Sequence, residues 1–165
     1  MGTDDLYLSA EKVGQALKTR HLTLATAESC TGGWVGEAVT AVPGSSQWFD
    51  RGFITYTNVS KQEMLGVCAQ TLAAHGAVSE QTVREMVAGA LAGSHAQVAL
   101  AVSGIAGPGG AVPGKPVGTV CFAWGGTSGS VVAETRHYAG TRGQVRAQSV
   151  QRALEGLLDW LVSQA

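Results

Sequence analysis

The stretch HLTLATA at residues 21–27 is followed by ESCTGG at 28–33 and WVGEAVTAV at 34–42. The first segment is short and largely apolar, which predicts a buried strand. The third segment can form a helix, so the three together predict a strand, a tight turn and a helix. Gly32 and Gly33 in the turn allow the backbone to approach a ligand closely, because neither residue has a Cβ atom.

Further helices and strands are predicted before and after this unit. Leu6, Ala10, Val13 and Leu17 form the apolar stripe of an amphipathic helix. We expect further strands at 48–57, 97–102, 117–124 and 131–138, and further helices at 59–65, 70–75, from Ser79 as N-cap, and at 142–162. Helices and strands alternate until a closing hairpin. This order predicts an α/β fold, a three-layer α/β/α sandwich with a mixed, mostly parallel sheet of about five strands, in one domain spanning 1–165.

Composition excludes several classes of protein. The 165 residues are 45% hydrophobic and 14% charged, which excludes wholesale disorder. Eleven basic and twelve acidic residues show no basic cluster, so we expect no nucleic-acid partner. No apolar run approaches the ~20 residues that span a membrane. Three scattered cysteines, without metal-type spacing to the four histidines, indicate reduced thiols, a cytoplasmic location and no metal site.

The turn at 28–33 is the first candidate site. Ser29 lies between a predicted strand and a predicted helix, where its hydroxyl would be exposed beside the free N–H groups of the helix start. Those N–H groups can hold an anion or an oxyanion. The alternative is an N-cap with glycines for close packing. Cys30 is a rival nucleophile, but no histidine is at hand to activate it, and we expect a small buried residue.

A serine nucleophile needs a base, and none of the four histidines has an obvious route to Ser29. A desolvated lysine can replace histidine. The chain has four lysines. Lys12 and Lys18 lie on the polar face of the first helix, which leaves Lys61 and Lys115. Lys61 follows a strand end with a tyrosine and an asparagine, a plausible pocket rim, although a solvated lysine in the first turn of a helix fits the same pattern.

Two further segments can bind an anion. VSGIAGPGG at 102–110 is a glycine-rich loop after a buried strand, where ligands bind in α/β sheets. It can cradle a phosphate, cover a substrate or be purely structural. Arg142 and Arg146 are four residues apart on one helix face and can pair with a phosphate. The alternative for them is a solvated helix start.

Taken in order, five segments resemble the CinA family, in its stand-alone C-terminal-domain form. They are AESCTGG (27–33), GSSQWFDRGFITYTNVSK (44–61), GAVSE (76–80), VSGIAGPGG (102–110) and KPVGTV (115–120). The resemblance covers nearly the whole chain. It implies a bacterial amidohydrolase that converts nicotinamide mononucleotide (NMN) and water to nicotinic acid mononucleotide and ammonia, without a metal or cofactor. It also implies the three-layer sandwich expected above.

The resemblance assigns residues position by position. It implies that Ser29 is the nucleophile and Lys61 the base, and that Tyr56 matches a further polar position of the family's pocket. In the chemistry that we expect, protonated Lys61 then donates to the departing ammonia, with Tyr56 as a catalytic proton relay. The expected substrate-binding residues are Glu28, Thr31, Gly32, Gly33, Ser103, Gly104, Arg142 and Arg146. Relatives often have an acid where this chain has Thr141, and some have aspartate in place of Gly109. These two departures concern the phosphate side of the site.

Other functions remain open at this point. A catalytically silent nucleotide-binding accessory protein of the same family would keep the pocket, although mere binding needs neither Ser29 nor Lys61. A serine–lysine peptidase would need an extended groove. The small-molecule partner expected is NMN. A homodimer is also expected, because four tryptophans need to be covered (Trp34, Trp48, Trp124 and Trp160).

Overall fold

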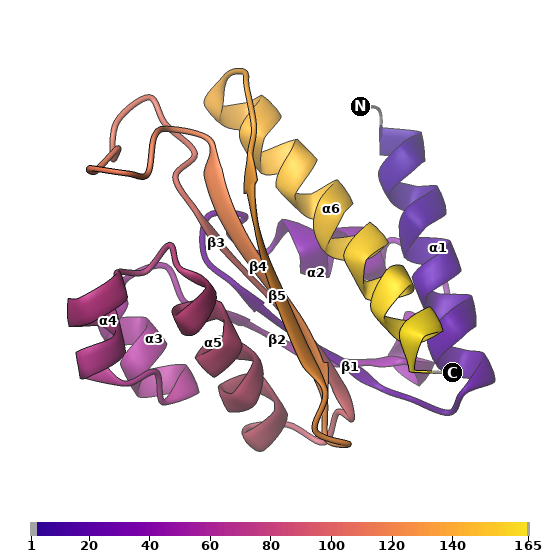
Figure 1. Ribbon diagram of the computed structural model, residues 1–165. Coiled ribbons are helices and arrows are strands. Elements are labelled where there is room, and N and C mark those ends of the chain that lie inside the picture. The colour runs from indigo at the N-terminus through magenta and orange to yellow at the C-terminus, as the bar shows by residue number, and fades with distance from the viewer. Residues whose placement is uncertain (1–2, 165) are drawn as a thin grey trace.

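A five-stranded sheet lies between two layers of helices in the computed structural model, which describes residues 3–164 (Figure 1). The helices are α1 (Thr3–Thr19), α2 (Trp34–Thr40), α3 (Asn58–Leu65), α4 (Ala69–His75), α5 (Glu80–Ala92) and α6 (Arg142–Ser163), with a short 3-10 helix, η1 (Ser45–Gln47). The strands are β1 (Leu24–Glu28), β2 (Phe49–Ile54), β3 (Val98–Gly104), β4 (Thr119–Gly126) and β5 (Val131–His137).

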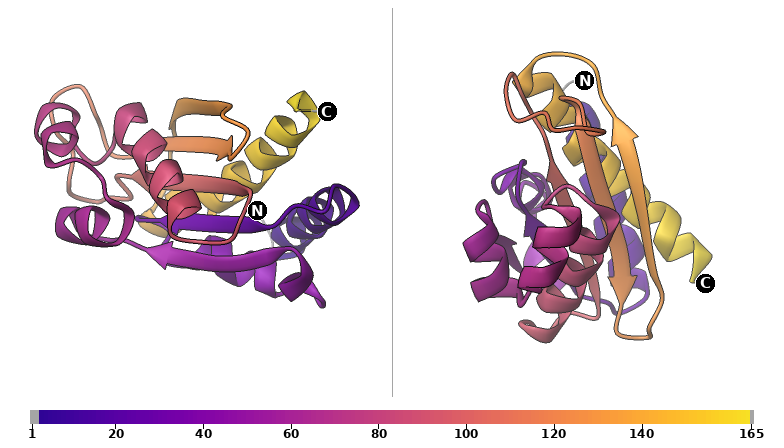
Figure 2. Two further views of the ribbon diagram at one scale, coloured as in Figure 1. Left: turned by 90° about the horizontal axis from the view of Figure 1, so that it is seen from below. Right: turned by 60° about the vertical axis from the view of Figure 1, so that its left-hand side comes forward.

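The strands lie side by side in the order β2-β1-β3-β4-β5, which the left view of Figure 2 shows. β1 pairs in parallel with both β2 and β3. β4 is antiparallel to its neighbours β3 and β5. Four strands therefore point one way and only β4 opposes them, which confirms the predicted mixed, mostly parallel sheet.

Each face of the sheet is covered by its own set of helices. α1, α2 and α6 cover one face, and α5 covers the other with α3 and α4 packed beside it (Figure 1). Two apolar clusters of buried residues fill the spaces between sheet and helices. β1 is buried along its whole length because it lies between β2 and β3 and is covered on both faces. The predicted three-layer sandwich is confirmed.

The apolar stripe expected in the first helix faces the core. Leu6, Ala10, Val13 and Leu17 of α1 are all buried. Burying one aliphatic side chain of this size contributes roughly 1.5–3 kcal/mol, so a stripe of this kind is enough to fix the helix against the sheet.

Some element boundaries differ from the sequence prediction. β1 begins at Leu24 rather than at residue 21, because His21 adopts a left-handed turn (φ 55°) after α1. β2 ends at Ile54 rather than at residue 57, because Thr57 caps α3 with its side chain. Such shifts are expected where a cap or turn competes with a strand.

The glycine-rich segment between β3 and β4 forms no helix and no central strand, as predicted. It contains a single β-bridge, between Val112 and Lys115. The segment arches over the end of the sheet where α6 begins (Figure 2, right). The Arg142 guanidinium, in the first turn of α6, donates to Gly107 O at 2.8 Å and so ties the segment to that helix.

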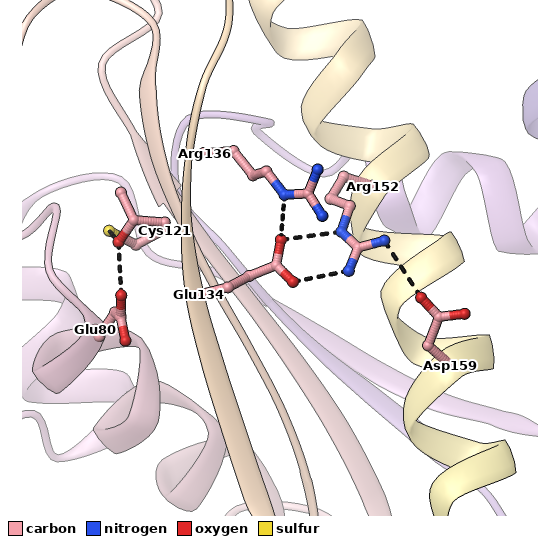
Figure 3. Close-up of polar contacts among 7 residues, drawn as sticks. Glu80, Cys121, Glu134, Arg136, Arg152 and Asp159 are labelled. Atoms are coloured by element: carbon pink, nitrogen blue, oxygen red, sulfur yellow. Dashed lines mark hydrogen bonds and ion pairs between the residues drawn. The ribbon is translucent and has the colours of Figure 1, made fainter.

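An ionic network fixes α6 to the outer strand of the sheet (Figure 3). Arg152 of α6 donates to both carboxylate oxygens of Glu134 on β5, at 3.0 and 2.7 Å. Arg136 donates to the same carboxylate at 2.6 Å, and Asp159 accepts from Arg152 at 3.4 Å. A two-pronged arginine–carboxylate pair restricts orientation as well as distance. The network therefore holds the helix whose first turns reach the site described next.

None of the helices within residues 3–164 combines the length and the apolar character that crossing a bilayer requires.

Candidate active site

A pocket with a volume of about 280 Å³ opens at the carboxyl ends of β1 and β3. β1 leads through α2 to β2 across one face of the sheet, and β2 leads through α3, α4 and α5 to β3 across the other. Ligands of α/β proteins bind where the chain diverges in this way. The pocket is lined by Ser29, Cys30, Tyr56, Lys61, Ala77, Val78, Ser103, Gly104, Ile105, Ala106, Gly107, Gly109, Gly110 and Arg142.

Ser29 and Lys61 meet in this pocket. Lys61 Nζ lies 3.0 Å from Ser29 Oγ, and it also lies 2.9 Å from Thr55 O and 3.2 Å from Tyr56 O. A neutral amine has two N–H groups and one lone pair. It can therefore donate to both carbonyls while its lone pair accepts the Ser29 hydroxyl proton. This is the geometry of a serine nucleophile with a lysine base.

Burial adjusts the lysine for that role. The Lys61 side chain is 1% exposed. Desolvation lowers the pKa of the amine from its ordinary 10.5 to about 8. At pH 7 this pKa leaves roughly one amine in ten neutral, against fewer than about one in a thousand for a solvated lysine.

The cap of α3 and the orientation of this helix place Lys61 in the pocket. Thr57 and Ser60 form a capping box that fixes the start of the helix. Lys61 faces the interior, whereas Val59 is 60% exposed and Met64 is 47% exposed. The helix thus buries a cation and exposes two apolar side chains, which reverses the usual pattern and is typical of a functional site.

The alternative base, Lys115, is absent from the lining of the pocket. Its ammonium donates to His75 O at 2.6 Å, in a different hollow beside β4. No histidine lines the Ser29 pocket in the part of the chain that the structure describes. Of the two lysines that the sequence left open, Lys61 is the one at the serine.

Glu28 does not line the pocket, although we expected it to bind substrate. Its carboxylate is buried at the start of α2, where Oε1 accepts from Val35 N at 2.9 Å and Gly33 N at 3.2 Å, and Oε2 accepts from Gly36 N at 3.0 Å. Thr31 Oγ1 donates to the same carboxylate at 2.6 Å. The helix N-terminus that we expected to hold an external anion is thus occupied by the chain's own side chain.

The occupied helix start changes the candidates for an oxyanion site. Gly33 N is bound to Glu28, and Gly32 N donates to Ser29 O at 3.0 Å. Neither glycine N–H is available to a substrate. Within residues 3–164, Cys30 N and Thr31 N have no hydrogen-bond partner in another residue. These are the two N–H groups that directly follow the serine, and Cys30 lines the pocket.

Cys30 does not compete with Ser29 as a nucleophile. Its thiol is buried, and desolvation raises its pKa to about 12. The thiolate is the reactive form of cysteine, so almost none is present at neutral pH. The expected small buried residue is confirmed.

Arg142 and Arg146 have different surroundings. Arg142 lines the pocket, and it donates to Tyr56 Oη at 2.9 Å. Arg146 does not line the pocket, and it donates to Cys30 O at 2.9 Å and to Thr31 O at 3.2 Å. Only Arg142 therefore presents its cation to a ligand in the pocket.

Tyr56 contributes two groups at different places. Its backbone carbonyl accepts from Lys61, whereas its side chain is 58% exposed and its hydroxyl accepts from Arg142. The expected proton relay would need the hydroxyl near Lys61, and the contact found for the hydroxyl is with Arg142 instead.

Ser103 and Gly104 close the opposite wall. Ser103 is buried and lines the pocket at the end of β3, yet its hydroxyl makes no hydrogen bond to any residue from 3 to 164. The hydroxyl is therefore available to a polar group of a substrate.

The amino-acid sequence of this chain matches one known protein family. Residues 7–161 match the family model described as the CinA C-terminal domain. The chain belongs to the CinA family. It is 50% identical over 157 residues to the nicotinamide-nucleotide amidohydrolase PncC of Escherichia coli K12, covering 95% of both chains. PncC of Pseudomonas putida is 49% identical over 155 residues, with 94% of this chain and 96% of that protein covered. The family expected from the sequence motifs is confirmed.

Solved structures of the CinA family have the same fold. The competence/damage inducible protein CihA of Agrobacterium tumefaciens superposes with a TM-score of 0.91 at 44% identity and 94% coverage of both chains. The CinA superfamily protein KP700603 of Klebsiella pneumoniae gives a TM-score of 0.93 at 38% identity and 99% coverage of both.

Some residues at the site of this CinA-family chain were missed by the sequence analysis. Thr55 binds Lys61 through its backbone carbonyl, and any residue type could supply that atom. Ala77 and Val78 form a wall of the pocket. They belong to the GAVSE segment, which supported the resemblance but received no role. That unused motif was the signal that could have located them.

Proposed function

We propose that this protein is a nicotinamide-nucleotide amidohydrolase, which converts NMN and water to nicotinic acid mononucleotide and ammonia. One observation carries the proposal: the buried amine of Lys61 lies 3.0 Å from Ser29 Oγ inside a pocket. Relatives named nicotinamide-nucleotide amidohydrolase PncC, about half identical to this chain, supply the substrate.

The first step is acylation of Ser29. The neutral Lys61 amine accepts the hydroxyl proton as Ser29 Oγ attacks the carboxamide carbon of NMN. The cationic pyridinium ring withdraws electrons from that carbon and so activates it. The carbonyls of Thr55 and Tyr56 hold the amine in place throughout, since both accept hydrogen bonds from it.

The attack places negative charge on the carboxamide oxygen. Preorganised N–H groups that point to such an oxygen lower the barrier, typically by about 3–4 kcal/mol for one donor. The N–H group of Cys30 is the candidate, because Cys30 follows the nucleophile, lines the pocket and has no partner for its N–H in another residue from 3 to 164.

Collapse of the tetrahedral intermediate expels ammonia and leaves an acyl ester on Ser29. Protonated Lys61 gives its proton to the departing nitrogen and becomes neutral again. A water molecule then attacks the ester carbon while Lys61 accepts its proton. The cycle ends when that proton returns to Ser29 Oγ and the acid is released.

Two groups orient the substrate. The Ser103 hydroxyl has no hydrogen-bond partner among residues 3–164 and is available to the carboxamide. Arg142 lines the pocket with a guanidinium held by Gly107 O and Tyr56 Oη, and we assign it to the substrate phosphate. In this proposal Tyr56 acts by holding Arg142 rather than as a proton relay.

We further propose that the protein works in the cytoplasm as a homodimer. Cys30, Cys68 and Cys121 are all free thiols. The tryptophans give no argument for a dimer, since three are buried within the chain and the fourth is half-buried. The exposed Ile54, Val59 and Met64 support one instead, because a second copy would remove these apolar side chains from water.

Ammonia release from NMN by the purified protein tests the proposed reaction. Ser29→Ala, Lys61→Met and a sample with added chelator are run beside it. We expect release that continues with chelator and falls by at least about a hundredfold in both variants. A folded protein that binds NMN without releasing ammonia would instead be the silent accessory protein considered from the sequence.

A further inference from the structure

Two peptide units follow Ser29, and both are held by their carbonyl groups. Ser29 O accepts from Gly32 N at 3.0 Å, and Cys30 O accepts from Arg146 Nε at 2.9 Å. In a trans peptide the N–H points away from the C=O of the same unit. The N–H groups of Cys30 and Thr31 are therefore directed away from these two bonds, and neither has a partner in another residue from 3 to 164. Of the two residues, Cys30 lines the pocket and Thr31 is fully buried.

Arg146 holds this turn from outside the pocket. Its second donor, Nη2, reaches Thr31 O at 3.2 Å, so one guanidinium binds two successive carbonyls. The same guanidinium lies over the Trp34 ring, 5.6 Å from its centre. A planar group held on an aromatic face and bonded through two nitrogens has little freedom to rotate.

The position of Arg146 is itself fixed. The residue lies on α6, the helix that Arg152 fastens to Glu134 of β5 (Figure 3). Gly32, within the turn itself, has φ 60°, a left-handed conformation that favours glycine. Arg146 is thus carried by a helix that is anchored to the sheet.

We infer that Arg146 is a positioning residue that holds the Ser29–Thr31 turn through Cys30 O and Thr31 O, so that the Cys30 N–H, which belongs to a residue of the pocket, stabilises the oxyanion formed at Ser29. Preorganised donors of this kind stabilise the transition state without binding the ground state more tightly. This inference rests on the proposed function for the identity of the substrate, and it replaces the substrate contact that the sequence predicted for Arg146.

Kinetics with NMN separate the two roles. We expect Arg146→Met to lower kcat by roughly 10- to 100-fold and to leave KM within about twofold, because only the transition state loses stabilisation. Arg142→Met is the matched control, and we expect it to raise KM because its cation faces the pocket. Arg146→Lys keeps the charge with a less suitable donor geometry and should recover part of kcat. It also replaces the methionine variant in this test if that variant does not fold. A raised KM with kcat intact in the Arg146 variants would overturn the inference.

Pyridine-3-boronic acid provides a test that does not depend on NMN turnover. Ser29 Oγ adds to boron, its proton passes to Lys61, and the boron becomes a tetrahedral anion that resembles the intermediate. By calorimetry we expect Ser29→Ala to abolish binding and Arg146→Met to weaken it by about the same factor as kcat. Equal boronate affinity in Arg146→Met and the unmodified protein would refute the positioning role. Boronate binding through Ser29 without ammonia release from NMN would instead refute the proposed reaction and leave the role of Arg146 measurable.

Discussion

Replacing Lys61 by methionine should change how stability depends on pH. Burial lowers the pKa of this amine from 10.5 to about 8, so the unfolded chain binds the proton more tightly than the folded protein. Stability therefore rises with pH between the two values and carries the full penalty below about pH 7. The shift of about 2.5 pKa units corresponds to a penalty of roughly 3 kcal/mol at neutral pH.

The variant isolates this contribution. Methionine fills a similar space without an amine, but it leaves the carbonyls of Thr55 and Tyr56 without the donor that they have in the native protein. That loss is independent of pH. We therefore expect the free energy of unfolding of the native protein, relative to Lys61→Met, to rise by roughly 1 kcal/mol from pH 7 to pH 9 and by roughly 2–3 kcal/mol from pH 7 to pH 10.

Urea denaturation followed by tryptophan fluorescence measures these differences at each pH, since Trp48, Trp124 and Trp160 are buried in the folded chain. Lys12→Met is the control, because Lys12 is exposed on α1 and its curve should stay parallel to that of the native protein. Parallel curves for Lys61→Met as well would show that the amine titrates normally in the folded state, and the argument for a lysine base would fail.

Three other predictions follow from the same site. The value of kcat/KM for ammonia release should rise about tenfold per pH unit below the Lys61 pKa of about 8 and level off above it, because only the neutral amine is a base; a flat profile from about pH 6 to pH 9 would contradict this. Glu28→Gln should lower the free energy of unfolding by about 1–3 kcal/mol in urea denaturation, because the amide cannot accept all four hydrogen bonds of the carboxylate. Glu37→Gln, at an exposed position on α2, is the control. Equal stability of the two variants would refute the capping role of Glu28. Tyr56→Phe should raise KM a few-fold through loss of its bond to Arg142 and leave kcat nearly unchanged, whereas a loss of kcat of about a hundredfold would restore the proton relay.

The fold could be predicted from the sequence because its signals are local and periodic. The stripe Leu6–Ala10–Val13–Leu17 and the buried strand before Glu28 are patterns that burial alone produces. Boundaries were less certain, because a single turn at His21 or a cap at Thr57 shortens a strand without changing its apolar pattern.

The site could be predicted in part, and the division has a physical reason. Ser29 and Lys61 were singled out because a serine nucleophile with a lysine base requires those residue types, and the structure brings the two side chains within 3.0 Å of each other. Glu28 and Arg146 were assigned to the substrate, since a charged side chain in a motif suggests an external partner. Their partners are backbone groups of the turn itself. A sequence does not show which backbone atoms a side chain will bind. The fold is therefore needed to tell the polar side chains that face a ligand from those that bind the chain itself.

α3 shows why the site is best understood as a function maintained at the expense of stability. Packing alone would favour turning Val59 or Met64 inward and Lys61 outward, yet the helix buries the amine and exposes both apolar side chains. The resulting penalty of roughly 3 kcal/mol is a large share of the 5–15 kcal/mol by which a domain is usually stable. Two separate apolar clusters, one on each face of the sheet, offset it. The lysine base that we propose requires this arrangement, because desolvation is the main influence that lowers the pKa of Lys61. The buried amine on α3 is therefore what the proposed chemistry at Ser29 demands of this helix.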